Sequence, residues 1–359
     1  MRITHLLSVA VPAILASVML GCGSGSSSKA PPPQPPDVYV AGFEATDTIR
    51  EVAMYWKNGT PVTLGASGYG STANSITVSG SDVYVAGQQG GTGQYDVATY
   101  WKNGVAVPLT DGTQYGYAHA IFVDGNDVYV AGQGGMIPTE NYVAQYWKNG
   151  VPVALTDGTN SADAWGILVS NGDVYVAGYE YQTTPTGPTS SYTTAVAKYW
   201  KNGVPTALSN PLTFGVAYSV VLSGNDIYVP GDDCQTAGAG CDTATYWLNG
   251  TPVVLTSQTP TYAISMAVSG TDIYIAGDQL TGNGNAIPDL WIDGTLTQLS
   301  SGGQSAANQL VLSGSDVYVA GADVIGGSSM AGYWKNGVFT PATDGTYFAS
   351  GFAMTVVSH

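Results

Sequence analysis

The chain repeats one pattern seven times, at intervals of 43 to 53 residues, and this repeat limits its possible folds more than any other feature. Each copy holds a DVYVAG-like segment, a stretch of variable length, a YWKNG-like segment and, five residues after its last glycine, a leucine, which the seventh copy replaces with Ala342. Strand-rich units of this length bury their apolar side chains only by packing on their neighbours. The first segments begin at Asp37, Asp82, Asp127, Asp173, Asp226, Asp272 and Asp316. The matching tryptophans are Trp56, Trp101, Trp147, Trp200, Trp247, Trp291 and Trp334.

The repeat predicts four antiparallel strands per copy, which we call strands a to d. Strand a is a segment such as residues 73–78, strand b is DVYVAG, strand c runs into YWKNG, and strand d ends at the leucine. The turn from c to d is Asn-Gly in six copies and Asp-Gly in one. These residues tolerate the positive φ of a type I′ turn, which joins two antiparallel strands tightly.

Seven copies of four strands predict an all-β fold, a seven-bladed β-propeller with four-stranded antiparallel blades. The chain enters the repeat at a strand b and ends after a strand a. Residues 352–357 (FAMTVV) are therefore predicted to pair into the first blade and close the ring. Closure removes the sheet edges that invite aggregation. We assign residues 37–359 to the propeller.

Length variation is concentrated at one end of this predicted propeller. The b-to-c stretches hold between 11 and 20 residues, whereas the glycine of the c-to-d turn always stands three positions after the tryptophan. In a four-stranded meander the b-to-c loops and the d-to-a connections share one end, which we call the variable face. The short turns share the other end, the uniform face. We expect a ligand or partner to bind at the variable face.

The residues before the propeller have the features of an export signal. Residues 6–21 form an apolar stretch that is short for a membrane span, which needs roughly 20 residues, so residues 1–21 are predicted to be a signal peptide. Met-Leu-Gly-Cys at its end resembles a bacterial lipobox, which makes Cys22 the predicted lipidation site; ordinary leader cleavage without lipid is the alternative. Residues 22–36 are a predicted Gly/Ser/Pro-rich tether. Together they predict an exported lipoprotein anchored to a membrane, at the outer membrane on its periplasmic or cell-surface side.

The cysteines agree with this prediction. The chain has three, and an odd number in an exported protein needs an explanation. If Cys22 carries lipid, Cys234 and Cys241 remain as a pair in a Gly-rich segment, and a disulfide between them is predicted. A metal site is the rival interpretation, but no histidine or second cysteine pair lies nearby, so no metal is expected.

Charge excludes one class of partner. The formal net charge is −16, with only 9% of residues charged. Such a surface repels phosphate backbones, so nucleic acid is not an expected partner. Attachment to a membrane is therefore expected through the lipid on Cys22. The protein is expected to be a monomer.

The VYVAG and YWKNG strands of residues 37–357 resemble those of bacterial β-propeller lipoproteins of unassigned role. They are distantly similar to kelch blades, from which they differ by lacking a Gly-Gly pair and by placing Tyr and Trp side by side. The Trp-Asp signature of WD repeats is missing. The resemblance implies the propeller fold and the membrane location, and it brings no catalytic residue and no cofactor.

Residues that break the repeat on the variable face are the candidate site. Aligning strand a across the copies places one residue from each blade in a ring at the mouth of the central channel. Its members are Asn74, His119, Trp165, Tyr218, Ile264, Asn308 and Phe352, of which all but Ile264 are candidate ligand or partner contacts. Nearby connections add Tyr69, Tyr115, Tyr117, Phe214, Tyr262 and Tyr347. Flat aromatic surfaces beside directional polar groups suit a sugar or another small polar ligand, and the alternative is that these side chains plug the channel.

Catalytic chemistry is less clearly marked. His119 is the single histidine of the propeller besides His359, and Asp163 is expected nearby on the next blade. A carboxylate pair for glycoside cleavage has seven candidates: Asp96, Glu140, Asp163, Asp232, Asp233, Asp278 and Asp289. There is no GxSxG, HExxH or phosphate-binding loop.

These observations predict a non-catalytic binding or scaffolding module that uses the variable face to hold a protein partner or a carbohydrate. A sugar would depend on Trp165, and a protein partner on the long loop of residues 179–194. The alternative is a propeller-type glycan hydrolase or lyase with acidic residues on the variable-face loops.

Overall fold

The computed structural model describes residues 34–359, except residues 46–49, 66–69, 91–94, 136–140, 188–189, 235–242, 256–260, 282–284, 302 and 304. The predicted signal peptide, the lipidation site Cys22 and most of the tether lie outside these residues. So do Cys241, Tyr69 and Glu140, and the disulfide between Cys234 and Cys241 therefore stays a prediction. Within the described chain, no helix is long and apolar enough to cross a membrane.

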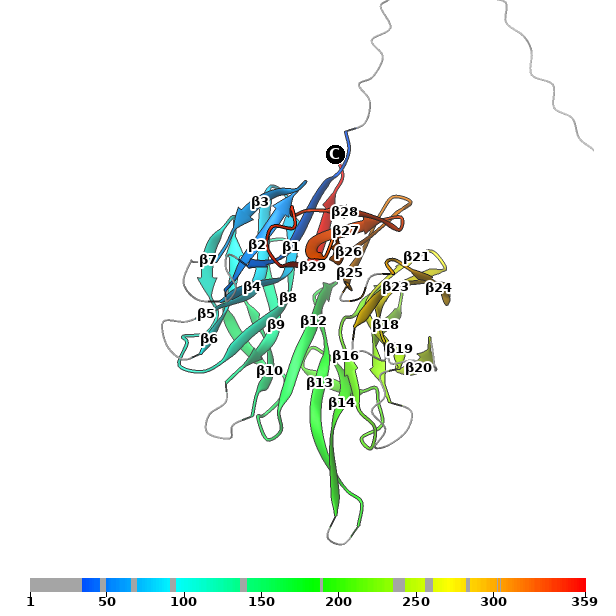
Figure 1. The fold of residues 1–359 in the computed structure, drawn as a ribbon. Helices are drawn as coiled ribbons and strands as arrows, with labels where there is room; N and C mark the ends of the chain where they lie inside the picture. Colours follow the sequence, from blue (N-terminus) through cyan, green and yellow to red (C-terminus); the bar gives the residue numbers. More distant parts are fainter. Residues whose placement is uncertain are drawn as a thin grey trace, which may run out of the picture. The chain divides into compact units, whose positions relative to one another are not determined.

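Seven antiparallel sheets, six with four strands and one with five, form the described domain (Figure 1). In each blade the strands follow the order a, b, c, d, with the a strands around the central channel. The all-β, seven-bladed β-propeller predicted from the repeat is confirmed.

The first four blades are numbered in chain order. Blade 1 also contains the C-terminal strand of the chain. Blade 1 contains β29 (Ala349–Val357), β1 (Asp37–Ala45), β2 (Glu51–Lys57) and β3 (Thr60–Thr63). Blade 2 contains β4 (Ser71–Ser79), β5 (Asp82–Gly90), β6 (Asp96–Lys102) and β7 (Val105–Pro108). Blade 3 contains β8 (Gly116–Asp124), β9 (Asp127–Gly134), β10 (Val143–Lys148) and β11 (Val151–Ala154). Blade 4 contains β12 (Ala162–Ser170), β13 (Asp173–Pro185), β14 (Ser191–Lys201) and β15 (Val204–Ala207).

The other three blades complete the ring. Blade 5 contains β16 (Gly215–Ala217), β17 (Val221–Ser223), β18 (Asp226–Asp233), β19 (Ala244–Leu248) and β20 (Thr251–Val254). Blade 6 contains β21 (Thr261–Ser269), β22 (Asp272–Leu280), β23 (Ala286–Ile292) and β24 (Thr295–Gln298). Blade 7 contains β25 (Ala306–Ser313), β26 (Asp316–Ile325), β27 (Ser328–Lys335) and β28 (Val338–Pro341).

The ring is closed by the C-terminal strand, as predicted. β29 pairs with β1 in antiparallel register from Asp37↔Val357 to Glu44↔Ala349. The strand begins three residues earlier than the FAMTVV segment that predicted it. Blade 1 is therefore built from both ends of the repeat region, and strand b of this blade has no free edge.

Tryptophans hold the blades together. All seven strand-c tryptophans are at most 1% exposed. Trp101 of blade 2, for example, packs against Tyr39, Ala41 and Leu64 of blade 1. Burying a large apolar side chain contributes roughly 1.5–3 kcal/mol, so this layer is a main source of stability.

The uniform face repeats one hydrogen-bonded unit, which is complete in blades 1, 2, 3, 4 and 7. At the c-to-d turn of blade 1, Asn58 and Gly59 have φ of 50° and 78°, as a type I′ turn requires. Asn58 Oδ1 accepts a hydrogen bond from the N–H of Val38 (2.8 Å), and its Nδ2 donates to Asp37 Oδ1 (2.7 Å). Lys57 pairs with the other oxygen of Asp37 at 2.7 Å. The recurring Asp and Asn are thus explained by turn structure.

One blade-to-blade difference stands out on the variable face. Strands β13 and β14 of blade 4 hold 13 and 11 residues and form a hairpin that extends well beyond the other blades (Figure 1, green, bottom). Much of the predicted loop of residues 179–194 is therefore regular antiparallel ladder, paired from Tyr179↔Ala197 to Pro185↔Ser191.

The glycine of DVYVAG determines how strand a approaches the channel. In blade 2, a Cβ at Gly87 would lie 1.9 Å from the carbonyl oxygen of Thr72, and the equivalent glycines of the other blades are equally close to strand a. Next to this contact the register shifts: Gly87 pairs with Ala73, Ala86 pairs with Ser75, and Asn74 is left as the extra residue of a β-bulge.

Blade 5 departs from the predicted continuous strand a, which is split into β16 and β17. In the other six blades an alanine precedes the strand-b glycine, but blade 5 has Pro230 there. Proline has no N–H to donate to the ladder. The N–H of Tyr218 still donates to the Pro230 carbonyl oxygen at 3.0 Å, so only the return bond is lost.

We predict that removing residues 349–359 exposes strand b of blade 1 and abolishes the single cooperative melt. The deletion uncovers a full strand edge and leaves the apolar layer around Met354 without a partner, so aggregation is expected. Thermal denaturation followed by circular dichroism and light scattering measures both effects. Removing only Ser358 and His359, which lie beyond β29, is the control, and an unchanged melt in the longer deletion would contradict closure by β29.

Candidate functional site

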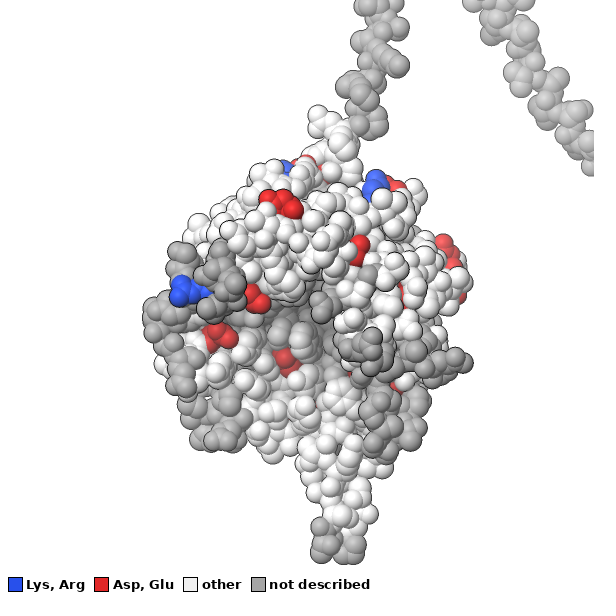
Figure 2. Space-filling view, viewed as in Figure 1, with Lys and Arg blue, Asp and Glu red and all other residues white. Residues whose placement is uncertain are grey.

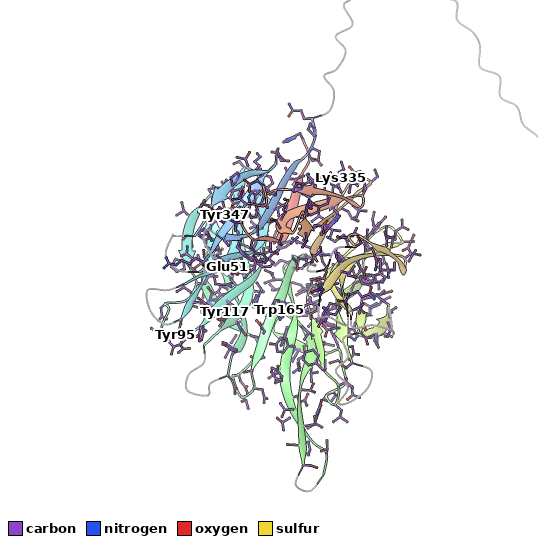
Figure 3. The ribbon with its side chains drawn as sticks, in the orientation of Figure 1. Glu51, Tyr95, Tyr117, Trp165, Lys335 and Tyr347 are labelled. Carbon is purple, nitrogen blue, oxygen red and sulfur yellow. The ribbon has the colours of Figure 1, made fainter. Side chains whose placement is uncertain are left out.

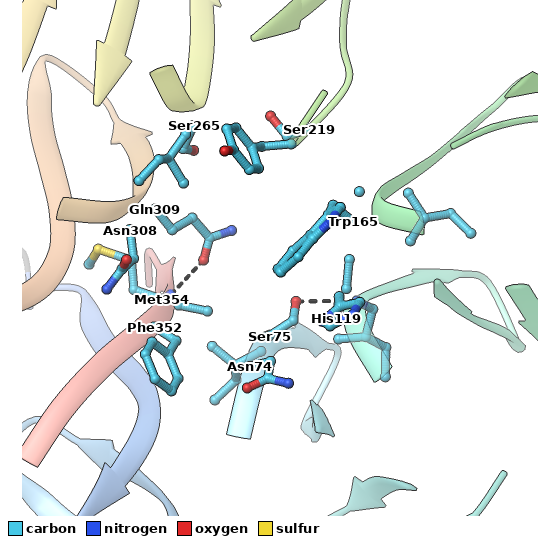
Figure 4. A pocket seen from close by; sticks show the side chains of 18 of the residues that line it. Asn74, Ser75, His119, Trp165, Ser219, Ser265, Asn308, Gln309, Phe352 and Met354 are labelled. Atoms are coloured by element: carbon cyan, nitrogen blue, oxygen red, sulfur yellow. Dashed lines mark hydrogen bonds between the residues drawn. The ribbon is translucent and has the colours of Figure 1, made fainter. Parts of the chain in front are cut away.

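The channel mouth is lined by the seven residues that the sequence alignment placed there. Six of them are the extra residue of a strand-a bulge, and Tyr218 stands at the break between β16 and β17. All seven line a cavity of about 810 Å³ that continues along the channel (Figure 4). The bulge turns each of these side chains out of the normal alternation of the strand. The sequence predicted the positions but not the bulge.

Two ring residues have a structural task. The Nδ2 of Asn74 donates to the carbonyl oxygen of Ala118 at 2.9 Å and to Gln88 Oε1 at 2.7 Å. The Nδ2 of Asn308 donates to the carbonyl oxygen of Gly351 at 2.8 Å. Each of these amides therefore ties its own blade to the strand a of the next blade around the ring.

A second inter-blade layer lies one residue deeper in the channel. Ser75 Oγ accepts a hydrogen bond from the N–H of Ile121 (3.2 Å), and Ser265 Oγ accepts one from Leu310 (3.0 Å). Gln309 Oε1 accepts from the N–H of Met354 at 2.6 Å. The sequence analysis missed these residues. The sequence does carry a signal for this layer, because each of these polar residues directly follows a ring position.

The ring position of blade 3 differs from this pattern because His119 contacts a carboxylate of blade 4, that of Asp163, two residues before the ring position of that blade. His119 Nε2 lies 3.1 Å from Asp163 Oδ2, and the side chains are 12% and 4% exposed. The other oxygen, Oδ1, accepts a hydrogen bond from the N–H of Ala164 at 2.8 Å. Both oxygens of the buried Asp163 are thus engaged, and the pair that the sequence left as conceivable is formed.

This geometry decides which nitrogen of His119 is available. An ionised carboxylate only accepts hydrogen bonds, so the proton of a neutral imidazole is assigned to Nε2, which donates to Asp163. The second nitrogen, Nδ1, then carries the lone pair. It has no hydrogen-bond partner among the described residues. The contact thus fixes the orientation of the ring and directs Nδ1 of the neutral imidazole away from Asp163.

Trp165 forms an aromatic wall beside this pair. It is the eighth tryptophan, and with 36% exposure it differs from the seven buried ones. Its ring stacks on the imidazole of His119 with centroids 4.2 Å apart and planes at 19°. The ring of Tyr218 approaches it edge-on at 6.1 Å. Figure 4 shows Trp165 pointing into the channel.

The other described acidic residues that the sequence offered as catalytic candidates do not lie together. Asp278 and Asp289 are buried at 7% and 0% exposure and do not line the cavity. Asp232 and Asp233 are likewise buried in blade 5. Asp96, at the start of β6, is half-buried beside Tyr117. The structure therefore supplies no pair of carboxylates on the described channel wall.

The cavity wall is uncharged apart from the titratable His119. None of the described lining residues is Lys, Arg, Asp or Glu. Among the described residues, no group of three or more His, Cys, Asp or Glu is placed to hold a metal ion. Figure 2 shows scattered acidic side chains and few basic ones around the central hollow. Electrostatics here favours an uncharged ligand over an anionic one.

Comparison with known proteins gives the fold and little sequence likeness. No protein-family model matches this sequence, and no curated protein matches it. Among solved structures, the chain is similar to a puromycin hydrolase (10% identity, TM-score 0.54) and to a puromycin-hydrolysing peptidase of Mycobacterium tuberculosis (11%, 0.51). It covers 54% and 53% of those chains, with 87% and 86% of its own length matched. It thus spans about half of each.

A third similar structure is a propeller alone. The chain matches the β-propeller domain of the trilobed protease from Pyrococcus furiosus at 9% identity and a TM-score of 0.50. The match covers 86% of this chain and 92% of that domain. These three similar structures are thus a puromycin hydrolase, a puromycin-hydrolysing peptidase and the propeller domain of a protease.

This finding contradicts the prediction of a non-catalytic binding or scaffolding module and favours the enzyme given as its alternative. The sequence left a pair of His119 and Asp163 conceivable but could not show that the two side chains are in contact, so binding was favoured over catalysis. At 9–11% identity the likeness itself establishes only the fold, so any chemistry has to be argued from the residues of the channel mouth.

The buried carboxyls of blade 6 make stability depend on pH. Burial raises the pKa of Asp278 and of Asp289 to about 7, from the usual 3.8 of an aspartate. The oxygens of Asp289 have no hydrogen-bond partner among the described residues. Between pH of about 4 and 7 the unfolded chain loses these protons while the folded chain keeps them, so stability falls as pH rises through this window.

We predict that Asp289→Asn is more stable than the parent protein above pH 7, by at most about 4 kcal/mol, because the amide removes the cost of ionising a buried acid. The advantage should shrink as pH falls and vanish near pH 4. Urea denaturation across this range measures it. Asp124→Asn, at the exposed end of β8, controls for the loss of one charge, and a pH-independent difference would contradict the assignment.

Proposed function

We propose that the protein is a glycan hydrolase that acts at the variable-face mouth of the channel, with His119 as its general base. The observation that carries this proposal is the 3.1 Å contact between His119 and the buried Asp163, beside the exposed face of Trp165. A base, a group that orients it and an aromatic wall converge on one cavity there.

The role of each group follows from its contacts. Nδ1 of His119 takes a proton from a water molecule that attacks the substrate. Asp163 keeps the imidazole in the required tautomer and stabilises the imidazolium that forms, since it holds Nε2 and is itself fixed by Ala164. Positioned acid–base groups of this kind typically accelerate a reaction by about 10²–10⁴-fold.

Hydrolysis of a glycoside also needs an acid that protonates the leaving group. Among the acids named from the sequence, Asp96 is the second one that the structure connects to His119. It interacts with Tyr117, whose ring stacks 6.4 Å from the imidazole. Burial raises the pKa of Asp96, which the interaction with Tyr117 partly offsets. A carboxyl that keeps its proton to higher pH suits this role.

The same surroundings favour an uncharged glycan and hydrolysis over elimination. A lyase that acts on a polyuronate has to neutralise the sugar carboxylate, and the described cavity wall offers no Lys or Arg for that. The net charge of −16 also repels an anionic polymer. A neutral sugar ring, in contrast, can pack on the apolar face of Trp165 and leave its hydroxyls for polar groups.

We also propose that the enzyme is exported and held at a membrane by a lipid on Cys22, which the leader and the Met-Leu-Gly-Cys sequence support. Cys22→Ser is predicted to shift the protein from the membrane pellet to the soluble fraction, because no other attachment is expected. Cell fractionation with an immunoblot measures this. Cys234→Ser is the matched control, and a variant at Cys22 that stays in the membrane fraction would refute the lipid anchor.

We predict that His119→Gln and Asp163→Asn each lower the hydrolysis of neutral polysaccharides by about 10²-fold or more, with little change in KM. Release of reducing ends from β-glucan, xylan and chitin oligomers measures this, and ultraviolet absorbance of unsaturated products detects a lyase.

His359→Gln provides the matched control, because His359 also faces an aspartate, Asp37 at 3.7 Å, at the uniform end of the molecule. Its activity should equal that of the parent protein. Turnover that survives in both channel variants, or products with unsaturated ends, would overturn the proposal.

A further inference from the structure

We propose that the substrate of this site is an extended oligosaccharide, whose sugar residues beyond the one at His119 bind along a row of aromatic side chains that runs outward from the channel mouth. We call this the aromatic row; it consists of Tyr95, Tyr115, Tyr117, His119 and Trp165. The inference rests on the proposed glycan hydrolysis and adds to it a binding site of several sugar residues.

The row is continuous from the mouth to the outer part of the variable face. Tyr115 and Tyr117 stand two positions apart at the start of β8, so they project from one side of the strand, and the ring of the bulge residue His119 stacks next to that of Tyr117. Their rings are nearly parallel, at 6.1 and 6.4 Å with planes 8° and 7° apart. Trp165 extends the row inward at 4.2 Å, and Tyr95 extends it outward at 4.8 Å.

Figure 3 shows the direction of the row, since Tyr95, Tyr117 and Trp165 follow one another from the side of the molecule to its centre. Tyr95 immediately precedes β6 of blade 2, whereas Trp165 belongs to β12 of blade 4. The row therefore crosses three neighbouring blades. Tyr142 flanks it, with its ring 6.4 Å from Tyr117 and steeply inclined to it.

Architecture does not require these side chains. The two positions that Tyr115 and Tyr117 occupy recur in all seven copies, two and four residues before the ring position, and blade 3 alone has aromatic residues at both. The four tyrosines of the row and its flank are half-buried, unlike the inter-blade tryptophans at 1% exposure or less. A departure from the repeat that is confined to one blade and reaches solvent indicates binding rather than packing.

The arrangement of the rings fits a chain of sugars. The rings from Tyr115 to Trp165 stack in sequence and Tyr95 meets Tyr115 edge-on, so ring surfaces and tyrosine hydroxyl groups follow one another along the partly exposed row. Each sugar residue then meets an apolar edge together with a phenol oxygen that donates or accepts a hydrogen bond. Tyrosine supplies this amphipathic surface with little loss of side-chain entropy on binding. No Lys or Arg is part of the row, which agrees with an uncharged polymer.

Binding of non-hydrolysable, thio-linked oligosaccharides tests the row separately from catalysis. We name as probes the disaccharide, tetrasaccharide and hexasaccharide of β-linked glucose, xylose and N-acetylglucosamine. Protection of tryptophan fluorescence from quenching is the readout, because Trp165 is the exposed one of the eight. For at least one sugar, affinity should rise with chain length. Tyr115→Ala and Tyr117→Ala should each weaken hexasaccharide binding by roughly 3- to 10-fold and leave disaccharide binding nearly unchanged.

Tyr347→Ala is the matched control. Tyr347 also lies on a d-to-a connection of the variable face, is 48% exposed and stands outside the row. Length-dependent binding without any turnover would leave the row in place and refute the hydrolase. Affinity that is independent of chain length for every sugar, an equal loss in Tyr347→Ala, or no binding of any probe would overturn the row.

Discussion

The structure depends on one close contact, between the strand-b glycine and the carbonyl group of the neighbouring strand a. A Cβ at Gly132 would stand 1.9 Å from the carbonyl oxygen of Tyr117, so only glycine permits the strands to approach there. That approach accompanies the register shift which leaves His119 as a bulge residue. A backbone requirement common to all blades thus sets the position of the residue to which we assign the chemistry.

The channel wall uses the ring positions of blades 2 and 7 for amide links between blades and that of blade 3 for the contact between His119 and Asp163. The side-chain amides of Asn74 and Asn308 each donate a hydrogen bond to a carbonyl oxygen of the next blade. His119 makes the equivalent link, from blade 3 to blade 4, through the carboxylate of Asp163. The contact between His119 and Asp163 needs no added loop or domain, because two side chains at an existing inter-blade contact are sufficient to form it.

The sequence predicted the blades, their number, the closing strand and the ring because each depends on periodicity and on turn chemistry. It did not reveal the bulge, since the glycine that permits it also occurs in ordinary strands. Nor could it show that Asp163 reaches His119, a contact of two residues 44 positions apart on different sheets. The break at Pro230 had a signal, a proline within strand b, which was overlooked. The aromatic row became visible only once Tyr95 and Tyr115 were placed side by side.

The pairing of β29 with β1 has a consequence for biosynthesis. Blade 1 cannot be completed until the last strand has been synthesised, although its other three strands are the first to be made. Contacts between distant parts of a chain form slowly, and the strand edges exposed in the meantime favour association between chains. A chain that is released from its N-terminus therefore presents β1 unpaired on this edge until β29 follows.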